Sequence, residues 1–142
     1  MTIHQLSIFI ENRSGTLIKV LEVLKQANIQ IIASTIADTA EYGIYRLVCS
    51  EPMRACEELK KAGVAVALSE VYALEIDDVP GRAADAVRAF SEAGISITYM
   101  YSFLLRGKGI LVFRTDNNEQ AVEVITRNQL HSIDESALTA LV

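Results

Sequence analysis

Residues 11–31, ENRSGTLIKVLEVLKQANIQI, and residues 77–97, DDVPGRAADAVRAFSEAGISI, are two versions of one segment. Sliding the chain along itself by 66 residues, without a gap, aligns them and places Gly15 on Gly81. A constant offset of this kind indicates that one unit of secondary structure occurs twice. The matched glycine predicts a backbone turn that a side chain would obstruct. The same offset aligns further identical residues: Ala27 with Ala93, Ile29 with Ile95, Ile31 with Ile97, Gly43 with Gly109, Ile44 with Ile110, and Ala55 with Ala121.

Within the first copy, the spacing of apolar residues changes from that of a strand to that of a helix. Alternation over residues 6–10 predicts a strand, and the stripe from Leu17 to Leu24 recurs at helical spacing. Asn28 and its counterpart Gly94 stand where a helix ends in the left-handed conformation. The other elements expected in the first copy are strands at 29–36, 44–49 and 64–68 and a helix that begins near Pro52 and ends at Gly63.

The second copy follows the same order. We expect strands at 71–76, 95–102 and 109–115, helices at 82–93 and 119–127, and a short closing strand or helix within 131–142. Each copy then reads β-α-β-β-α-β, which is typical of a ferredoxin-like α+β sandwich with an antiparallel sheet and its helices on one face. The predicted domains are residues 1–69 and 70–142, with only Ser69 and Glu70 left over between the last strand of one copy and the first strand of the next.

The composition argues against several classes of protein. The chain has 142 residues, 51% of them hydrophobic, and a formal net charge of −5 with acidic and basic residues interspersed. This charge pattern argues against a nucleic acid or an anionic membrane as a partner. No apolar run approaches the length of a membrane span, and residues 1–5 lack the basic region of a signal peptide. Because Cys49 and Cys56 are too few for a disulfide framework, we expect a reduced, cytoplasmic protein.

Catalytic motifs do not emerge from the sequence. His4 and His131 are the only histidines, and neither lies in a nucleophile or general-base motif. The chain also lacks a phosphate-binding or dinucleotide-binding glycine signature. Glu11, Asp77 and Asp78 lie near the ends of the predicted first strands, and we interpret them as solvated charges favoured by the next helix N-terminus. We therefore predict no enzyme, no catalytic residue and no cofactor.

Metal and RNA sites are also disfavoured. Cys49 and Cys56 are seven residues apart without a nearby histidine, so we interpret them as small buried residues and predict no metal site. Residues 106–113, RGKGILVF, approach the pattern of an RNA-recognition strand. However, Lys108 and Ile110 stand where the base-stacking aromatic residues would be. A glycine turn leading into a buried strand is the better interpretation.

The turn between the first strand and the first helix carries a family resemblance. Residues 11–17, ENRSGTL, and residues 77–83, DDVPGRA, each run from a strand into a helix that ends in Ala-Asn-Ile-Gln-Ile or Ala-Gly-Ile-Ser-Ile. This pattern resembles the ACT domain, a regulatory module of amino-acid metabolism with an acidic residue or Asn, Pro-Gly, a helix and Gly-Ile-Asn-Ile. The first copy departs from it with Ser14 in place of proline, and the second has Ala83 where the first has Leu17. The whole chain is similar to stand-alone tandem ACT proteins without a catalytic domain.

The resemblance implies a ligand held between the strand-helix turn of one unit and the second strand of its neighbour. The first-turn amides of a helix suit a carboxylate, and Asn12, Asp78 or strand carbonyls would accept from an ammonium group. Carried over to this chain, one site comprises Asn12, Arg13, Ser14, Gly15, Thr16 and Leu17, facing Tyr99, Met100 and Tyr101. The reciprocal site comprises Asp78, Val79, Pro80, Gly81 and Arg82, facing Ala33, Ser34 and Thr35.

The two implied sites differ in their walls. Tyr99–Tyr101 is bulky and suits histidine or an aromatic amino acid, whereas Ala33–Thr35 is small and polar. Alternatively, Tyr99 or Tyr101 packs at the seam between the copies, and we expect one of the two to face the helices. We expect a non-catalytic sensor that binds a free amino acid, forms a homodimer and regulates a separate enzyme. The alternative is a structural adaptor or a subunit of a multi-chain enzyme of amino-acid metabolism.

Overall fold

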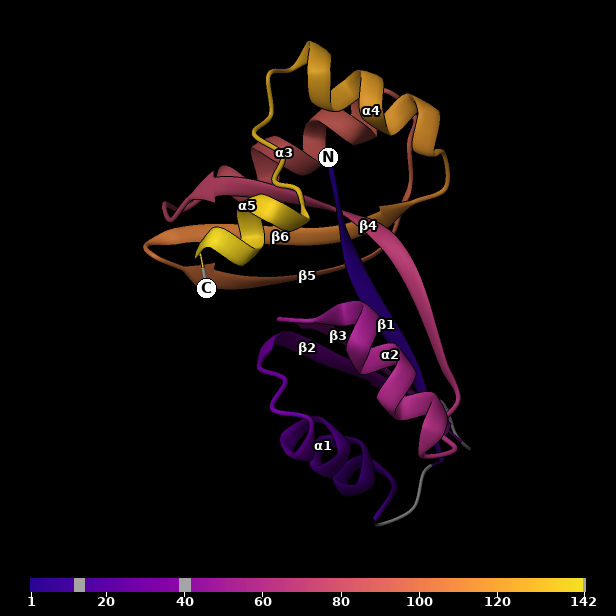
Figure 1. The fold of residues 1–142 in the computed structure, drawn as a ribbon. Coiled ribbons are helices and arrows are strands. Elements are labelled where there is room, and N and C mark those ends of the chain that lie inside the picture. The colour runs from indigo at the N-terminus through magenta and orange to yellow at the C-terminus, as the bar shows by residue number, and fades with distance from the viewer. Residues whose placement is uncertain (12–14, 39–41, 142) are drawn as a thin grey trace. The chain divides into compact units, whose positions relative to one another are not determined.

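The computed structural model describes residues 1–11, 15–38 and 42–141 (Figure 1). The strands in this part of the chain are β1 (Thr2–Glu11), β2 (Ile31–Asp38), β3 (Tyr42–Cys49), β4 (Val66–Asp77), β5 (Ile97–Leu105) and β6 (Lys108–Thr115). The helices are α1 (Thr16–Gln26), α2 (Pro52–Lys61), α3 (Arg82–Glu92), α4 (Asn118–Arg127) and α5 (Glu135–Leu141). Across these described ranges, every helix is too short or too polar to cross a lipid bilayer.

The predicted repeat is confirmed down to the register of the strands. Helices α1 and α2 and strand β3 recur as α3, α4 and β6, with both ends displaced by the same 66 residues. Leu6 lies opposite Leu47 in the first repeat, and Tyr72 lies opposite Phe113 at the equivalent place in the second. The irregularity near the start of β2 also recurs near the start of β5. One backbone plan is therefore built twice from different side chains.

Between the two repeats the structure corrects the sequence-based expectation. The sequence predicts separate strands at 64–68 and 71–76, with Ser69 and Glu70 between them. Instead, one continuous strand, β4, spans Val66–Asp77. Residues 64–76 contain no glycine, proline, asparagine or aspartate that would break a strand. Strand β4 therefore closes the first β-α-β-β-α-β repeat and opens the second.

Residues His4–Glu70 form one compact unit. Its strands follow the order β2-β3-β1 with antiparallel pairing, and α1 and α2 lie on one face of them (Figure 1). The apolar stripe of α1 faces this sheet, because Val20 and Leu24 are buried and contribute to the core. Helix α2 begins with a proline in its first turn, as predicted, and adds Ala55 and Leu59 to the same core.

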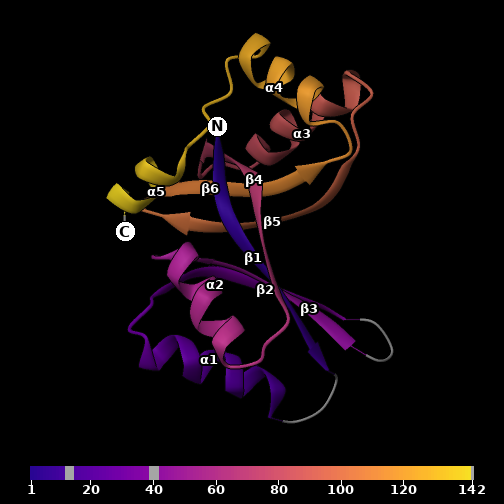
Figure 2. The same ribbon diagram turned by 45° about the vertical axis from the view of Figure 1, so that its right-hand side comes forward.

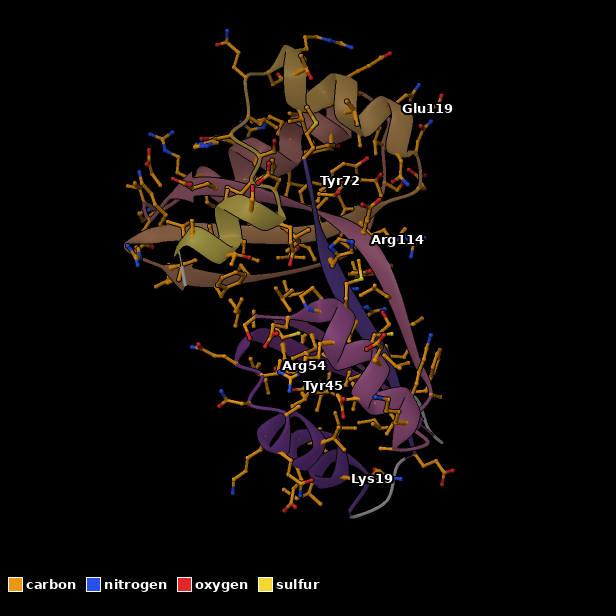
Figure 3. All side chains as sticks on the ribbon, in the orientation of Figure 1. Lys19, Tyr45, Arg54, Tyr72, Arg114 and Glu119 are labelled. Carbon is orange, nitrogen blue, oxygen red and sulfur yellow. The ribbon has the colours of Figure 1, made fainter. Side chains whose placement is uncertain are left out.

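The second compact unit comprises residues Val71–Leu141 together with Met1–Ile3. Its strands follow the order β4-β6-β5, again antiparallel, and α3 and α4 cover one face (Figure 2). Its core contains aromatic residues: the ring of Phe113 lies 5.1 Å from that of Phe90 and 5.7 Å from that of Tyr72, centroid to centroid. Tyr72 is labelled in Figure 3. The predicted pair of ferredoxin-like α+β units is confirmed.

The end of the second repeat contains both elements that the sequence left open. Ser132 forms an isolated antiparallel bridge with Leu74, and the amide of Glu75 donates to the carbonyl of His131 at 2.8 Å. Residues near 132 thus take the place of the repeat's last strand, reduced to a single bridge.

Helix α5 then ends the described chain. Its Leu138 is buried, and Asp134 precedes the helix with Oδ1 accepting from the amide of Ala137 at 2.9 Å. At the other end of α5, Arg106 Nε donates to the carbonyl of Leu141 at 2.8 Å. This bond ties α5 to the turn between β5 and β6.

Candidate functional site

The strand-helix turn of the second unit leads from the end of β4 into α3. Gly81 has φ 92° and immediately precedes the helix. A Cβ at Gly81 would meet nothing within 4 Å, so the backbone conformation, and not a neighbouring atom, favours glycine here. The amide of Val79 donates to the carbonyl of Asp77 at 2.9 Å, and that of Arg82 donates to Val79 at 3.3 Å. Because glycine has no side chain, it cannot cap the first amides of α3.

A pocket of about 350 Å³ opens beside this turn, and we call it the turn pocket. Of the predicted site residues, Asp78, Val79 and Gly81 line it, whereas Pro80 and Arg82 do not. The whole lining belongs to the second unit and consists of Ile76, Asp77, Asp78, Val79, Gly81, Ala83, Ser102, Phe103, Leu104, Gly109 and Leu111.

The turn pocket combines polar and apolar groups. The carboxylate of Asp78 is exposed, and Ala83 belongs to the first turn of α3, whose amides have no partners within the helix. Val79 and Leu104 are apolar yet 52% and 66% exposed. Such a lining can receive a small molecule that carries a carboxylate, an ammonium group and an apolar side chain.

Asp77 also lines the turn pocket, but it is already paired. Lys108 Nζ donates to Asp77 Oδ1 at 2.6 Å. This hydrogen bond lowers the pKa of Asp77 from its ordinary 3.8 and raises the pKa of Lys108 from 10.5. Both side chains are about half exposed, so water weakens the pair.

The equivalent turn of the first unit is described only in part. Three of its predicted site residues lie outside the described residues: Asn12, Arg13 and Ser14. Gly15 has φ 95° and precedes α1 in the same way as Gly81 precedes α3. Thr16 Oγ1 donates to the carbonyl of Glu11 at 2.8 Å, and Leu17 packs against the core of the unit.

The predicted second-strand residues lie on the outermost strand of each three-stranded order. Ala33, Ser34 and Thr35 belong to β2, and the segment Tyr99–Tyr101 belongs to β5. The pairing of each segment with the turn of the other copy stays a prediction.

The expectation that Tyr99 or Tyr101 faces the helices is wrong. Residues two apart in a strand point to the same side, so the two tyrosines share a face of β5. Met100, between them, lies opposite Phe113, which belongs to the helix-covered core. Met100 therefore takes the helix side, where it is still 43% exposed.

Sequence reasoning missed the residues of β5 that do line the turn pocket, which are Ser102, Phe103 and Leu104. The available signal was the repeated glycine, since Gly109 lies opposite Leu104 in the β5–β6 pair. At Gly109 the place of a side chain is taken by Ile76, another residue of the turn pocket. A Cβ at Gly109 would lie 3.0 Å from Ile76 Cγ1, so glycine lets β6 pack closely on β4.

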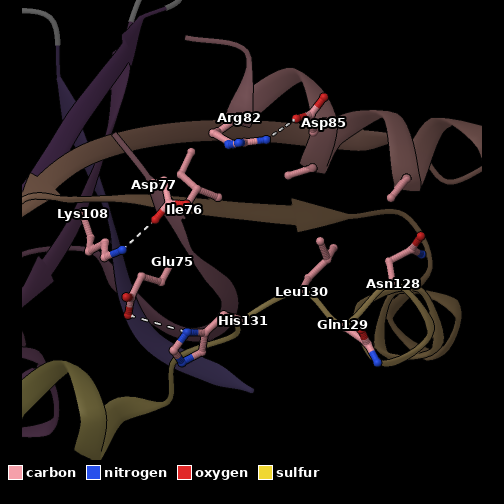
Figure 4. A pocket seen from close by; sticks show the side chains of 12 residues that line it. Glu75, Ile76, Asp77, Arg82, Asp85, Lys108, Asn128, Gln129, Leu130 and His131 are labelled. Carbon is pink, nitrogen blue, oxygen red and sulfur yellow. Dashed lines mark hydrogen bonds and ion pairs between the residues drawn. The ribbon is translucent and has the colours of Figure 1, made fainter. Parts of the chain in front are cut away.

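The second unit carries another pocket, of about 520 Å³, which we call the polar pocket (Figure 4). Three acid-base pairs lie in its lining. Arg82 Nη1 is 3.2 Å from Asp85 Oδ2, Lys108 is bonded to Asp77 as above, and His131 Nδ1 is 4.0 Å from a carboxylate oxygen of Glu75. The full lining is Glu75, Ile76, Asp77, Arg82, Asp85, Ala86, Ala89, Lys108, Asn128, Gln129, Leu130 and His131.

Both cysteines are buried, as predicted from the sequence. Cys49 and Cys56 belong to the core of the first unit, and neither forms a disulfide in the described part of the chain. Within the described ranges, no group of three or more His, Cys, Asp or Glu side chains is arranged to hold a metal ion.

The sequence and the fold were compared with known protein families and solved structures. The family described as "ACT domain pair" matches residues 1–142. The crystal structure of protein BT0572 from Bacteroides thetaiotaomicron has a TM-score of 0.91 and 37% sequence identity, covering 98% of this chain and 96% of that chain. The ligand-free regulatory subunit of aspartate kinase from Thermus thermophilus has a TM-score of 0.61 at 15% identity, covering 87% and 91%. The subunit from Thermus flavus gives 0.60 at 17%, covering 87% and 90%. No curated protein matches the sequence.

Proposed function

The chain belongs to the family of ACT domain pairs, and we propose that it is a non-catalytic regulatory protein that binds a free amino acid in the turn pocket of its second unit. The observation that carries the proposal is the meeting of Gly81, the uncapped first turn of α3 and the Asp78 carboxylate at one pocket. A helix N-terminus attracts a carboxylate. A neighbouring carboxylate attracts an ammonium group.

The apolar part of the turn pocket supports a choice of ligand. Val79 and Leu104 line it together, and burying these two exposed apolar side chains against a ligand is favourable at about 25 cal/mol per Å². We therefore propose an amino acid with an apolar side chain, aliphatic or aromatic. Its carboxylate would accept from the first-turn amides of α3, and its ammonium group would donate to Asp78.

Regulation would follow from the binding energy. A ligand that binds one conformation of the protein more tightly shifts the population toward it, and couplings between sites are typically about 1–3 kcal/mol. We propose that the partner receiving this signal is an enzyme of amino-acid metabolism, as the family membership suggests. A cytoplasmic location and a homodimeric state are part of the same proposal.

Thermal unfolding in the presence of each of the twenty amino acids tests the proposal. A ligand at about 100 times its Kd stabilises the folded state by about 2.7 kcal/mol, which raises the Tm of a chain of this size by about 5–10 °C. We expect one or a few apolar amino acids to give this shift. Val79→Asp should abolish it, because the carboxylate repels the ligand's own and removes an apolar contact.

Val122→Asp is the matched control. Val122 is also an exposed valine of the second unit, 39% exposed on α4, and lines neither the turn pocket nor the polar pocket. This variant should respond as the wild type does. If no amino acid raises the Tm, or if Val79→Asp responds as Val122→Asp does, the turn pocket is not the site. The adaptor or enzyme-subunit function would then replace the sensor.

A further inference from the structure

The first repeat gives an internal reference for what this fold requires, and the polar pocket departs from it. The amide of Phe9 donates to Ala65 at 3.0 Å, as the amide of Glu75 donates to His131 at 2.8 Å one repeat later. The backbone is thus the same at both places, but an aromatic ring and a methyl group in one repeat become a carboxylate and an imidazole in the other. The fold alone therefore does not require a charge at position 75.

Glu75 is the group in the polar pocket whose placement most needs an explanation. Its side chain is only 21% exposed. His131 Nδ1 lies 4.0 Å from a carboxylate oxygen of Glu75, which is beyond hydrogen-bond distance, and Glu75 also interacts electrostatically with Lys108. The oxygens of Glu75 are not among the fully buried side-chain atoms without a partner in the described chain, so water still reaches them and they can accept from a ligand. A positively charged ligand group would satisfy this carboxylate.

The other charges of the pocket define what the rest of such a ligand carries. Arg82 and Lys108 lie on α3 and β6, and each is paired with an acid whose side chain is more than half exposed. Exposed ion pairs are worth little, so both cations can turn to a ligand carboxylate. A polyanion such as a nucleotide would meet three carboxylates in this lining, and a polyamine would meet the two cations.

We propose that the polar pocket binds a small zwitterion of dipeptide size, distinct from the ligand of the turn pocket. Its ammonium group donates to Glu75, and its carboxylate accepts from Arg82 and Lys108. The volume of about 520 Å³ lies within the usual range of ligand sites, about 300–1,000 Å³. Asn128 and Gln129 also line the pocket (Figure 4). Since Asn128 Nδ2 already donates to the carbonyl of Val124 at 2.9 Å, Gln129 is the amide that suits a ligand with a polar side chain.

Titration of the full chain with alanyl-glutamine, followed by amide NMR shifts, tests this site. We expect saturable shifts at residues 75–77, 82–86 and 128–131. Glu75→Gln keeps the size of the side chain and removes its charge, which should weaken binding about tenfold or more. Arg82→Gln should do the same. N-acetyl-alanyl-glutamine lacks the ammonium group and alanyl-glutaminamide lacks the carboxylate, so each should bind wild type at least about tenfold more weakly.

Lys19→Gln is the control, since Lys19 lies on α1 of the first unit (Figure 3), and it should bind as the wild type does. The proposal is overturned if the polar-pocket amides do not shift, if only residues 78, 79 and 102–104 shift, or if Glu75→Gln and both modified probes bind as well as the originals. The zwitterion proposal can fail while the proposed amino-acid binding in the turn pocket holds, and the reverse is also true. Val79→Asp removes the amino-acid response of the turn pocket but leaves the alanyl-glutamine titration unchanged.

Discussion

Asp77 and its neighbour Ile76 line both the turn pocket and the polar pocket. The carboxylate of Asp77 is held by Lys108. The first repeat has Glu11 and Tyr42 at the equivalent positions, so an aspartate-lysine pair between these two positions does not recur there. A ligand in either proposed site would therefore lie beside the Asp77–Lys108 pair.

Removing the lysine should release the Asp77 carboxylate. In Lys108→Met, the pKa of Asp77 should rise toward its ordinary 3.8, because the hydrogen bond that lowers it is lost. Carbon-detected NMR titration of the aspartate carboxyls measures this directly. Lys61→Met, which breaks an exposed pair with Glu58 in the first unit, should leave Asp77 unchanged. An unmoved Asp77 pKa in Lys108→Met would show that the pair does not persist in solution.

The same pair has a defined pH window. The pKa of Asp77 is lowered on folding, so its contribution is complete above the unfolded-state value near 3.8 and is lost as the pH falls through the lower folded-state value. The pKa of Lys108 is raised, so its contribution is complete below about 10.5 and is lost as the pH rises through the higher folded-state value.

Some single residues could be predicted from the sequence and others could not. Asn28 and Gly94 have φ 57° and 74°, as predicted for residues that end a helix in the left-handed conformation, because few residue types tolerate this geometry. The role that we propose for Glu75 could not be predicted. A carboxylate on a strand looks the same in the sequence whether it faces water or a pocket. Only the comparison with Phe9, 66 residues earlier, carried a signal.

At the scale of helices and strands, prediction succeeded where many residues contribute to one pattern. The two helices of each repeat have buried apolar residues at helical spacing. The continuity of β4 was missed because repeat matching suggested a joint at Ser69 and Glu70, whereas a strand needs a breaking residue to end. The sequence could not show whether the last segment forms a helix or a strand, because α5 has only seven residues and only Leu138 among them is buried.

Helix α5 should depend on its first residues. Asp134 Oδ1 accepts from the amide of Ala137 at 2.9 Å and from Ser136 Oγ at 2.8 Å, and these bonds lower the pKa of Asp134. Asp134→Ala should fray the helix, which the ¹³Cα shifts of residues 135–141 would report, and Asp134→Asn should retain most of it. The wild-type helix should weaken only as the pH falls through the lowered folded-state pKa, below 3.8. Unchanged shifts in Asp134→Ala would show that other contacts hold α5.

At the scale of the whole molecule, the two repeats share a backbone but differ in chemistry. Both pockets described above belong wholly to the unit that contains Val71–Leu141. The fold class could be predicted from the 66-residue offset, because a backbone that occurs twice leaves similar residues at many equivalent positions of the sequence. The location of the pockets did not follow, because it depends on where the two copies differ.

Ligand binding should therefore protect the two units unequally. With the amino acid that raises the Tm at saturating concentration, amide hydrogen exchange should slow more in residues 71–141 than in residues 4–70, because a ligand stabilises most the region that must open to release it. Mass spectrometry of peptic fragments measures both regions in one experiment. Equal or greater protection of residues 4–70 would contradict a site confined to the second unit.

Because the two repeats have the same strand register, a strand of one repeat could pair with a strand of the other while the chain folds. By backbone hydrogen bonding alone, β1 could pair with β6 as readily as with β3, and misassembly of this kind is a common failure of repeat proteins. Side-chain volume opposes it. In the native pairs Leu6 faces Leu47, and Tyr72 faces Phe113 with ring centroids 5.7 Å apart. A crossed pair would set a leucine against an aromatic ring in both units, overfilling one core and leaving a void in the other. The difference in side-chain size between the two cores therefore favours the native strand pairs over the crossed ones.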